Sequence, residues 1–212
     1  MSEPINVQQA IASIDQATTR RQLLVATTAL ADTQSILAAD KLIEVLGYNN
    51  PATAVVATRG LIKLGTAVVP QVIASLDDHN YSARAWALSV LADLRDPRSL
   101  EALIDAAQND LAPSVRRTAL RGLATMRFSA SDQAAMLQRC CTSLVHACSD
   151  PEWVVRYAAI FGLEHVLSRG GLATDSIQTC RMCLHRSQLA DVETVMVVRL
   201  RARVALQRLT DK

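Results

Sequence analysis

A nine-residue pattern recurs four times in this chain, and it constrains the fold more than any other feature. Each copy has a small or β-branched residue, an arginine, two variable residues, an alanine, three further residues and a leucine. The copies read ARAWALSVL, VRRTALRGL, VRYAAIFGL and VRLRARVAL, and they begin at residues 83, 115, 155 and 198. Their arginines are 32, 40 and 43 residues apart. A pattern that returns at such intervals is typical of a repeat protein.

An acidic residue stands six positions before the arginine of every copy. We interpret the acid as part of a turn and the arginine as part of the helix that follows it. Held in register from repeat to repeat, the two can form a ladder of charge-assisted hydrogen bonds that links neighbouring repeats. The residues assigned to this structural ladder are Asp78, Arg84, Asp110, Arg116, Asp150, Arg156, Glu193 and Arg199.

Each copy also follows a separate stretch with apolar residues near i, i+3, i+4 and i+7, which indicates a helix. Asp, Asn and Pro at the joins provide turn and N-cap chemistry. The unit is therefore a helical hairpin of about 30 to 43 residues, and the fold class is all-α. We expect a HEAT-like α-solenoid of about five hairpins, with one domain over 1–212, capping helices in 1–33 and repeats in 34–212.

The composition agrees with closely packed helices. Half of the 212 residues are apolar but only 3% are aromatic, so Ala, Leu and Val must fill the interior. The net charge of +2 gives no electrostatic footprint for nucleic acid. The polar start MSEPINVQQAIASIDQ does not resemble a signal peptide, and no apolar run looks long enough to span a bilayer. We therefore expect a cytoplasmic protein without a transmembrane segment.

The five cysteines have two interpretations. Cys180 and Cys183 form a C-x-x-C pair, which can be half of a zinc site. No second pair stands at a standard spacing, although Cys140 and Cys141 are adjacent. We favour reduced thiols packed in the core for these four cysteines and for Cys148. We therefore expect no metal site.

Three segments resemble a known family. They read EVLGYNNPATAVVATRGLIKLG, LDDHNYSARAWALSVLADLRDPRSLEALIDAAQNDLAPSVRRTALRGL and CSDPEWVVRYAAIFGLEHVL. They are similar to the bilin-lyase HEAT-like repeat proteins of cyanobacteria, above all to the beta-type (smaller) subunits of heterodimeric phycocyanobilin lyases that act on the phycocyanin α chain. The resemblance extends over roughly residues 40–170, and NYSARAW and DPEWVVRYAA are its most specific parts.

The resemblance implies one half of an obligate heterodimer with a larger HEAT-repeat subunit. Such a pair takes up phycocyanobilin as a substrate and helps a cysteine thiol of apo-phycocyanin α add to the ethylidene group on ring A, which gives a thioether. It uses no cofactor and acts in the cytosol near the phycobilisomes. The alternative is a non-catalytic HEAT adaptor or chaperone for phycobiliprotein assembly or degradation.

A related pair also isomerises the bilin, and the resemblance gives its beta-type member a His-Cys dipeptide. Here Ala147 follows His146 and Arg186 follows His185. Simple ligation is therefore favoured over isomerisation.

A bilin has two propionates and a flat conjugated body, so it needs arginine or lysine, aromatic faces, and an acid or histidine near the pyrrole nitrogens. The scarce aromatics gather at or just after the turns that open the second helices of the repeats. The residues predicted to bind bilin or a partner are Tyr48, Asn80, Tyr81, Trp86, Arg117, Trp153 and Tyr157. Trp86 and Tyr157 could instead fill gaps between alanine-rich helices.

Two further features keep two interpretations each. His79 is the catalytic candidate because its unperturbed pKa, near 6.5, suits an acid or base, but we favour a solvated turn histidine over a catalytic role. The last predicted helix carries Arg199, Arg201, Arg203 and Arg208. These could bind an acidic partner or phosphate, or form a solvated face that ends the repeat stack.

Overall fold

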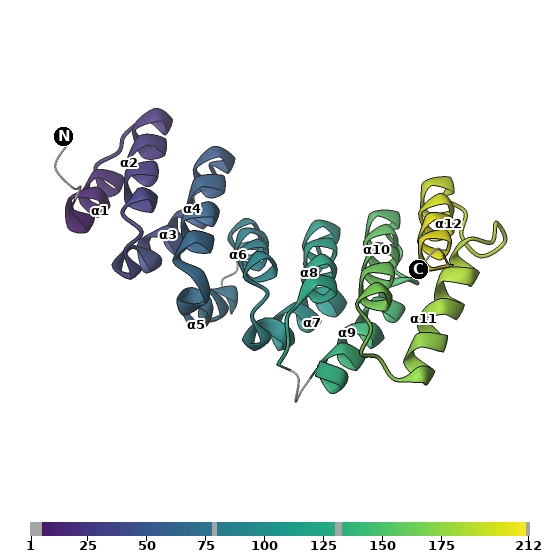
Figure 1. Cartoon of the computed structure of the whole chain (residues 1–212). Coiled ribbons are helices and arrows are strands. Elements are labelled where there is room, and N and C mark those ends of the chain that lie inside the picture. The colour runs from purple at the N-terminus through teal and green to yellow at the C-terminus, as the bar shows by residue number, and fades with distance from the viewer. Residues whose placement is uncertain (1–5, 78–79, 130–132, 211–212) are drawn as a thin grey trace. The chain divides into compact units, whose positions relative to one another are not determined.

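The computed structural model describes residues 6–77, 80–129 and 133–210, and these residues form helices and no strand. Figure 1 shows the helices following one another in antiparallel pairs. The α-helices are α1 (Val7–Asp15), α2 (Arg20–Asp32), α3 (Ala39–Leu46), α4 (Pro51–Leu64), α5 (Val69–Ala74), α6 (Tyr81–Leu94), α7 (Leu100–Asn109), α8 (Pro113–Thr125), α9 (Gln133–Ala147), α10 (Trp153–Arg169), α11 (Thr174–Ser187) and α12 (Met196–Thr210). Short 3₁₀ helices lie at η1 (Ile36–Ala38), η2 (Gly65–Val68), η3 (Ser75–Asp77) and η4 (Pro97–Ser99). The predicted all-α class is confirmed.

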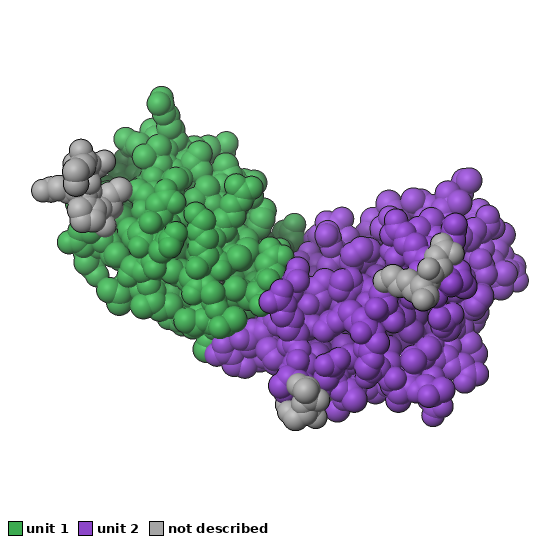
Figure 2. All heavy atoms as spheres, in the orientation of Figure 1, with its two compact units in different colours: residues 1–94 green, residues 95–212 purple. Residues whose placement is uncertain are grey.

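The helices fall into two compact units, residues 1–94 and 95–212 (Figure 2). In the first unit α1 packs on α2, α3 on α4, and α5 on α6. The second helices of these pairs form a row, because α4 contacts both α2 and α6. The α1–α2 hairpin coincides with the segment predicted to cap the repeats. The assignment of a single domain over the whole chain stays a prediction.

The second unit repeats this arrangement. Helix α7 packs on α8, α9 on α10, and α11 on α12. Helix α10 lies between α8 and α12, and α9 contacts both α7 and α11, so the first and second helices form separate rows (Figure 1). The predicted helical hairpins and the HEAT-like stacking are confirmed in both units.

Small residues set how closely the two helices of a hairpin pack. Gly162 faces Leu144, and a Cβ atom at this glycine would overlap the Leu144 side chain. The equivalent positions of the neighbouring second helices are also small and buried, with Gly122 on α8 and Ala205 on α12. A chain poor in aromatics can therefore fill its interior by bringing helix backbones close together.

One helical run is an exception to the expected absence of a membrane-length apolar segment. Residues Pro51–Ala74, 24 in all, are long and apolar enough to cross a membrane by length and composition, with a mean hydropathy of 1.4 over an 18-residue window. The expectation that no such run exists was wrong on those criteria. In the fold the run is α4, η2 and α5, with α4 ending at Leu64 and capped by Gly65 (φ 75°). Its α4 part packs against α2, α3 and α6 as a core helix of its unit.

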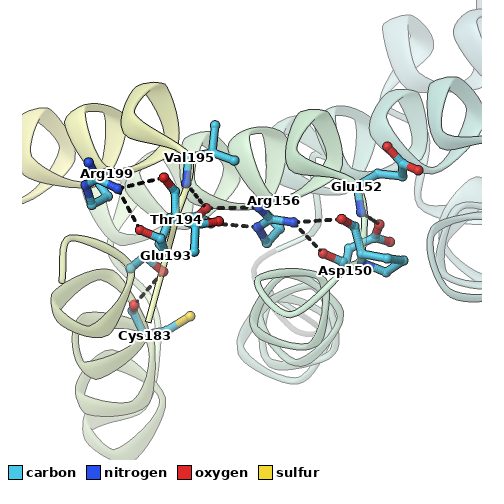
Figure 3. Close-up of polar contacts among 10 residues, drawn as sticks. Asp150, Glu152, Arg156, Cys183, Glu193, Thr194, Val195 and Arg199 are labelled. Atoms are coloured by element: carbon cyan, nitrogen blue, oxygen red, sulfur yellow. Dashed lines mark hydrogen bonds and ion pairs between the residues drawn. The ribbon is translucent and has the colours of Figure 1, made fainter. Parts of the chain in front are cut away.

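Two arginine–carboxylate pairs connect consecutive repeats in the second unit. Arg116 donates from Nε and Nη2 to the two carboxylate oxygens of Asp150, at 2.7 and 2.9 Å. Arg156 donates in the same way to Glu193, at 2.6 and 2.9 Å (Figure 3). Each pair joins the second helix of one repeat to the turn of the next, as the predicted ladder requires.

The same arginines also hold the turn of their own repeat. Arg156 Nη1 donates to the carbonyl oxygens of Asp150 and Pro151 at 2.8 and 2.9 Å, and Arg199 Nη1 donates to those of Glu193 and Thr194 at 2.8 and 2.9 Å (Figure 3). The acidic residue and the arginine are therefore six positions apart in sequence because the arginine binds the backbone carbonyl oxygen of that acidic residue. The carboxylate of the same acidic residue accepts hydrogen bonds from the arginine of the preceding repeat.

The acids themselves shape the turns. A carboxylate oxygen of Asp110 accepts the backbone N–H of Ala112, and Asp150 and Glu193 accept that of the second residue after them in the same way, all at 2.8 Å. In the first unit, Asp78 lies outside the described residues. Arg84 is half-buried on α6, where its backbone N–H donates to the Asn80 carbonyl oxygen at 3.0 Å.

Replacing Glu193 with alanine should destabilise the protein by about 3 kcal/mol, because it leaves the Arg156 guanidinium desolvated without its carboxylate. Only 5% of the Glu193 side chain and 15% of the Arg156 side chain are exposed. Glu101→Ala is the matched control, since the Glu101–Arg139 pair has exposures of 73% and 43%. That change should cost less than about 1 kcal/mol. Urea unfolding of each variant measures the difference, and equal losses would contradict a special role for the ladder.

The contribution of Glu193 should depend on pH. Hydrogen bonds from Arg156 lower the pKa of Glu193 below its ordinary value. The stabilisation is therefore complete above the unfolded pKa, about 4.3, and is lost as the pH falls from there through the lower folded pKa. Unfolding of wild type and Glu193→Gln between pH 7 and 3 should show the difference in free energy of unfolding shrinking only in the acidic range.

Gly162→Ala should destabilise the protein by about 1 to 3 kcal/mol, because the added methyl group overpacks the contact with Leu144. Leu144→Ala alone should cost about 2 to 5 kcal/mol through the cavity it leaves. The double variant should lose less than the sum of the two, since the new methyl group enters the space vacated by Leu144. Additive losses in thermal unfolding would show that the two positions do not share one contact.

Candidate functional site

Two predicted aromatics stand at the start of α10. Trp153 is 44% exposed and Tyr157 is 36% exposed, and they lie one helical turn apart. Arg156, between them in sequence, fixes the turn from which α10 starts, because it binds the carbonyl oxygens of Asp150 and Pro151. The ladder thus positions this aromatic pair while leaving it accessible.

Tyr157 also lines a groove between α10 and α12, with a volume of about 400 Å³. The residues around it are Tyr157, Phe161, Val197, Leu200, Arg201, Val204 and Arg208. Neither Phe161 nor Val197 was among the predicted binding residues. Phe161 follows Tyr157 by four positions on a helix, and this spacing was the available signal. Arg201 is buried in the fold, which differs from the solvated face considered for the last helix.

In the first unit, Tyr48 belongs to a small polar network. Its hydroxyl donates to Glu44, which also binds Lys41 at 2.6 Å, and Lys41 reaches Asp15 at 2.8 Å. Burial, and then the hydrogen bond to Glu44, raise the pKa of Tyr48 to about 12. Tyr48 is therefore a neutral phenol whose proton is already engaged by a carboxylate.

Asn80 takes part in the scaffold at the start of α6. Its Oδ1 accepts the backbone N–H groups of Ser82 and Ala83, both at 3.1 Å, and its Nδ2 donates to the Gly47 carbonyl oxygen at 3.0 Å. It caps one helix and binds the turn of the preceding repeat, a contact that the sequence did not suggest.

The remaining predicted residues are spread over both units. Tyr81 is exposed at the start of α6, and the half-buried Trp86 lies five positions later, on a different side of the helix. Arg117 is exposed on α8. The catalytic candidate His79 lies outside the described residues. The predicted set therefore forms two groups, with Tyr48, Asn80, Tyr81 and Trp86 in the first unit and the other members in the second.

The cysteines are free thiols, and most are poorly placed to react. Cys140, Cys141 and Cys180 are buried, and burial raises the pKa of Cys140 to about 12. The half-buried Cys183 differs, because a hydrogen bond from Cys148 lowers its pKa. Within residues 6–77, 80–129 and 133–210, no three His, Cys, Asp or Glu side chains gather in a way that could hold a metal ion. A buried protonated thiol is a poor nucleophile.

Comparison with known proteins supports the repeat assignment. The family model for HEAT repeats matches residues 39–124, and that for a single HEAT repeat matches residues 141–169. The chain is 47% identical over 203 residues to the bilin biosynthesis protein RpcF of a Synechococcus species, covering 96% of each chain. It is 42% identical over 163 residues to the phycocyanin alpha phycocyanobilin lyase CpcF of a Synechocystis species, covering 76% of each.

A solved structure shows the same similarity in three dimensions. The complex of CpcE and CpcF of phycocyanin lyase from a Nostoc species contains a chain that superposes with a TM-score of 0.74 at 36% identity. The match covers 81% of the present chain and 99% of the other. With HEAT repeats in both units and similarity along most of its length, the chain belongs to the family of phycocyanobilin lyase beta subunits.

Proposed function

We propose that this chain is the smaller subunit of a phycocyanobilin lyase that attaches the bilin to a cysteine of apo-phycocyanin α through a thioether bond. The observation that supports this most is the similarity to a phycocyanin alpha phycocyanobilin lyase at 42% identity, together with the superposition on a chain from the CpcE–CpcF complex. The partner is a larger HEAT-repeat subunit, and the cytoplasm is the compartment in which the pair acts.

The reaction places few chemical demands on this subunit. The substrate cysteine adds its sulfur across the ethylidene double bond of ring A, so one C–S bond forms and the thiol proton passes to the bilin. Nothing is released, and no electrons leave or enter the system. The nucleophile comes from the substrate protein, so holding the two reactants in the productive geometry can supply much of the rate enhancement. We propose phycocyanobilin as substrate and no cofactor for this chain.

An α-solenoid suits such a role because the second helices within each unit form a row of side chains. Trp153 and Tyr157 on α10 and Tyr81 on α6 are exposed aromatics that could stack on a flat tetrapyrrole or contact the acceptor protein. Arg117 on α8 could pair with a propionate. The protonated thiols of the core are not needed as nucleophiles.

The purified chain, mixed with its larger partner, apo-phycocyanin α and phycocyanobilin, should produce a covalent adduct much faster than the mixture without it. The adduct is detected as zinc-induced fluorescence on a denaturing gel, and its absorbance should be that of bound phycocyanobilin rather than of an isomerised bilin. An acceptor whose cysteine is replaced by serine is the control for thioether formation.

Omission of each subunit in turn separates the two candidate functions. An adduct rate no higher than that of the mixture lacking this chain would contradict the lyase assignment. Binding to phycocyanin α with no change in that rate would instead support the alternative of a HEAT adaptor or chaperone.

A further inference from the structure

Arg201 has an unusual environment at the base of the groove between α10 and α12. Only 8% of the residue is exposed, and its guanidinium carbon lies 5.6 Å from the centre of the Phe161 ring. Nη2 donates to Glu164, but Nη1 is buried and has no hydrogen-bond partner among the described residues. An unpartnered buried N–H group of a charged side chain is costly. The groove is thus lined by an arginine whose buried Nη1 has no acceptor in the described part of the chain.

The charges around Arg201 do not balance. The Glu164 carboxylate forms ion pairs with two arginines. One oxygen binds Arg201, and the other lies 3.4 Å from Arg208 Nη1. Two guanidinium groups that share one carboxylate leave one positive charge in excess. Since 66% of the Arg208 side chain is exposed, it can turn toward a ligand without breaking a buried contact. The groove therefore favours an anion.

The walls of the groove are apolar. Val197, Leu200 and Val204 of α12 are 39 to 44% exposed, and Tyr157 and Phe161 face them from α10. A volume of about 400 Å³ is near the lower end of the usual range for small-molecule sites, so the groove would hold part of a larger molecule. A small hydrated anion would leave these apolar walls uncovered, whereas an apolar or conjugated carboxylate would use both the walls and the charge.

We propose that this groove binds a carboxylate on an apolar, conjugated molecule, and that on binding the Arg201 guanidinium shifts so that its buried Nη1 donates to that carboxylate. Resting on the proposed function, this assigns the groove to one propionate-bearing half of phycocyanobilin. Phe161 holds the guanidinium from one side through a cation–π contact, and Glu164 fixes its orientation. Arg201 is thus a binding residue, and Glu164 and Phe161 are positioning residues.

The test compares phycocyanobilin with its dimethyl ester, in which both propionates are neutral. Each is titrated by absorbance into the complex of this chain with the larger subunit. Wild type should bind the free acid about tenfold or more tightly than the ester, since a charge-assisted hydrogen bond is lost on esterification. In Arg201→Met this preference should shrink to about twofold or less, because the donor that distinguishes the two ligands is gone.

A second variant avoids changing a buried charge. Leu200→Glu places a carboxylate at a position that is 44% exposed in the groove wall, and should weaken binding of the free acid about tenfold or more by repulsion and loss of apolar contact. Met182→Glu on α11, at a position 54% exposed and outside the groove, is the matched control and should bind like wild type.

The outcomes separate this inference from the proposed function. If the wild-type pair attaches the bilin but Arg201→Met and Leu200→Glu bind acid and ester as wild type does, the groove assignment is overturned and the lyase function stands. If Leu200→Glu no longer co-purifies with the larger subunit, the groove is a subunit interface and the assignment is again overturned. If the wild-type pair neither binds nor attaches phycocyanobilin, both proposals fail.

Discussion

The bidentate bond between Arg156 and Glu193 shows the interaction on which the second unit depends. One guanidinium binds the carboxylate of the next repeat and, through its third nitrogen, two carbonyl oxygens of its own turn. It therefore joins the turn that starts α10 to the turn of the next repeat. A desolvated ion pair contributes little net stability compared with apolar packing, but it strongly penalises arrangements that separate its members. Arg116 and Asp150 make the same contact one repeat earlier.

The ladder arginines and the groove lie on different sides of the second helices. Arg199 takes the ladder position on α12, where it binds the carbonyl oxygens of Glu193 and Thr194. Arg201 comes two residues later, about 200° around the helix, and reaches the groove beside Phe161 instead. Two arginines that look equivalent in the sequence thus have different roles. The first holds the scaffold, and the second offers a donor to a ligand.

Much of the architecture could be predicted, because the repeat pattern records helix contacts that recur. The hairpins, the α1–α2 cap and the use of alanine and leucine in the interior follow from periodicity and composition. The site was harder to predict, since the aromatics near turns were judged by position alone. Asn80 has an N-cap and inter-repeat contact that a single sequence does not reveal, and Phe161 was overlooked because it lies in mid-helix. The apolar run Pro51–Ala74 likewise needed the fold to show that it packs as a core helix.

The sequence by itself determined the helical repeat and the pairing of each acid with an arginine six residues later, because both are regular along the chain. Only the tertiary structure decided which groups these residues bind. Glu193 gives its carbonyl oxygen to Arg199 and its carboxylate to Arg156, which is 37 residues away. Likewise, Arg201 is buried with one N–H group unpartnered in the described part of the chain because α10 and α12 pack side by side. Such contacts join residues from different repeats, and the distance between repeats is set by packing.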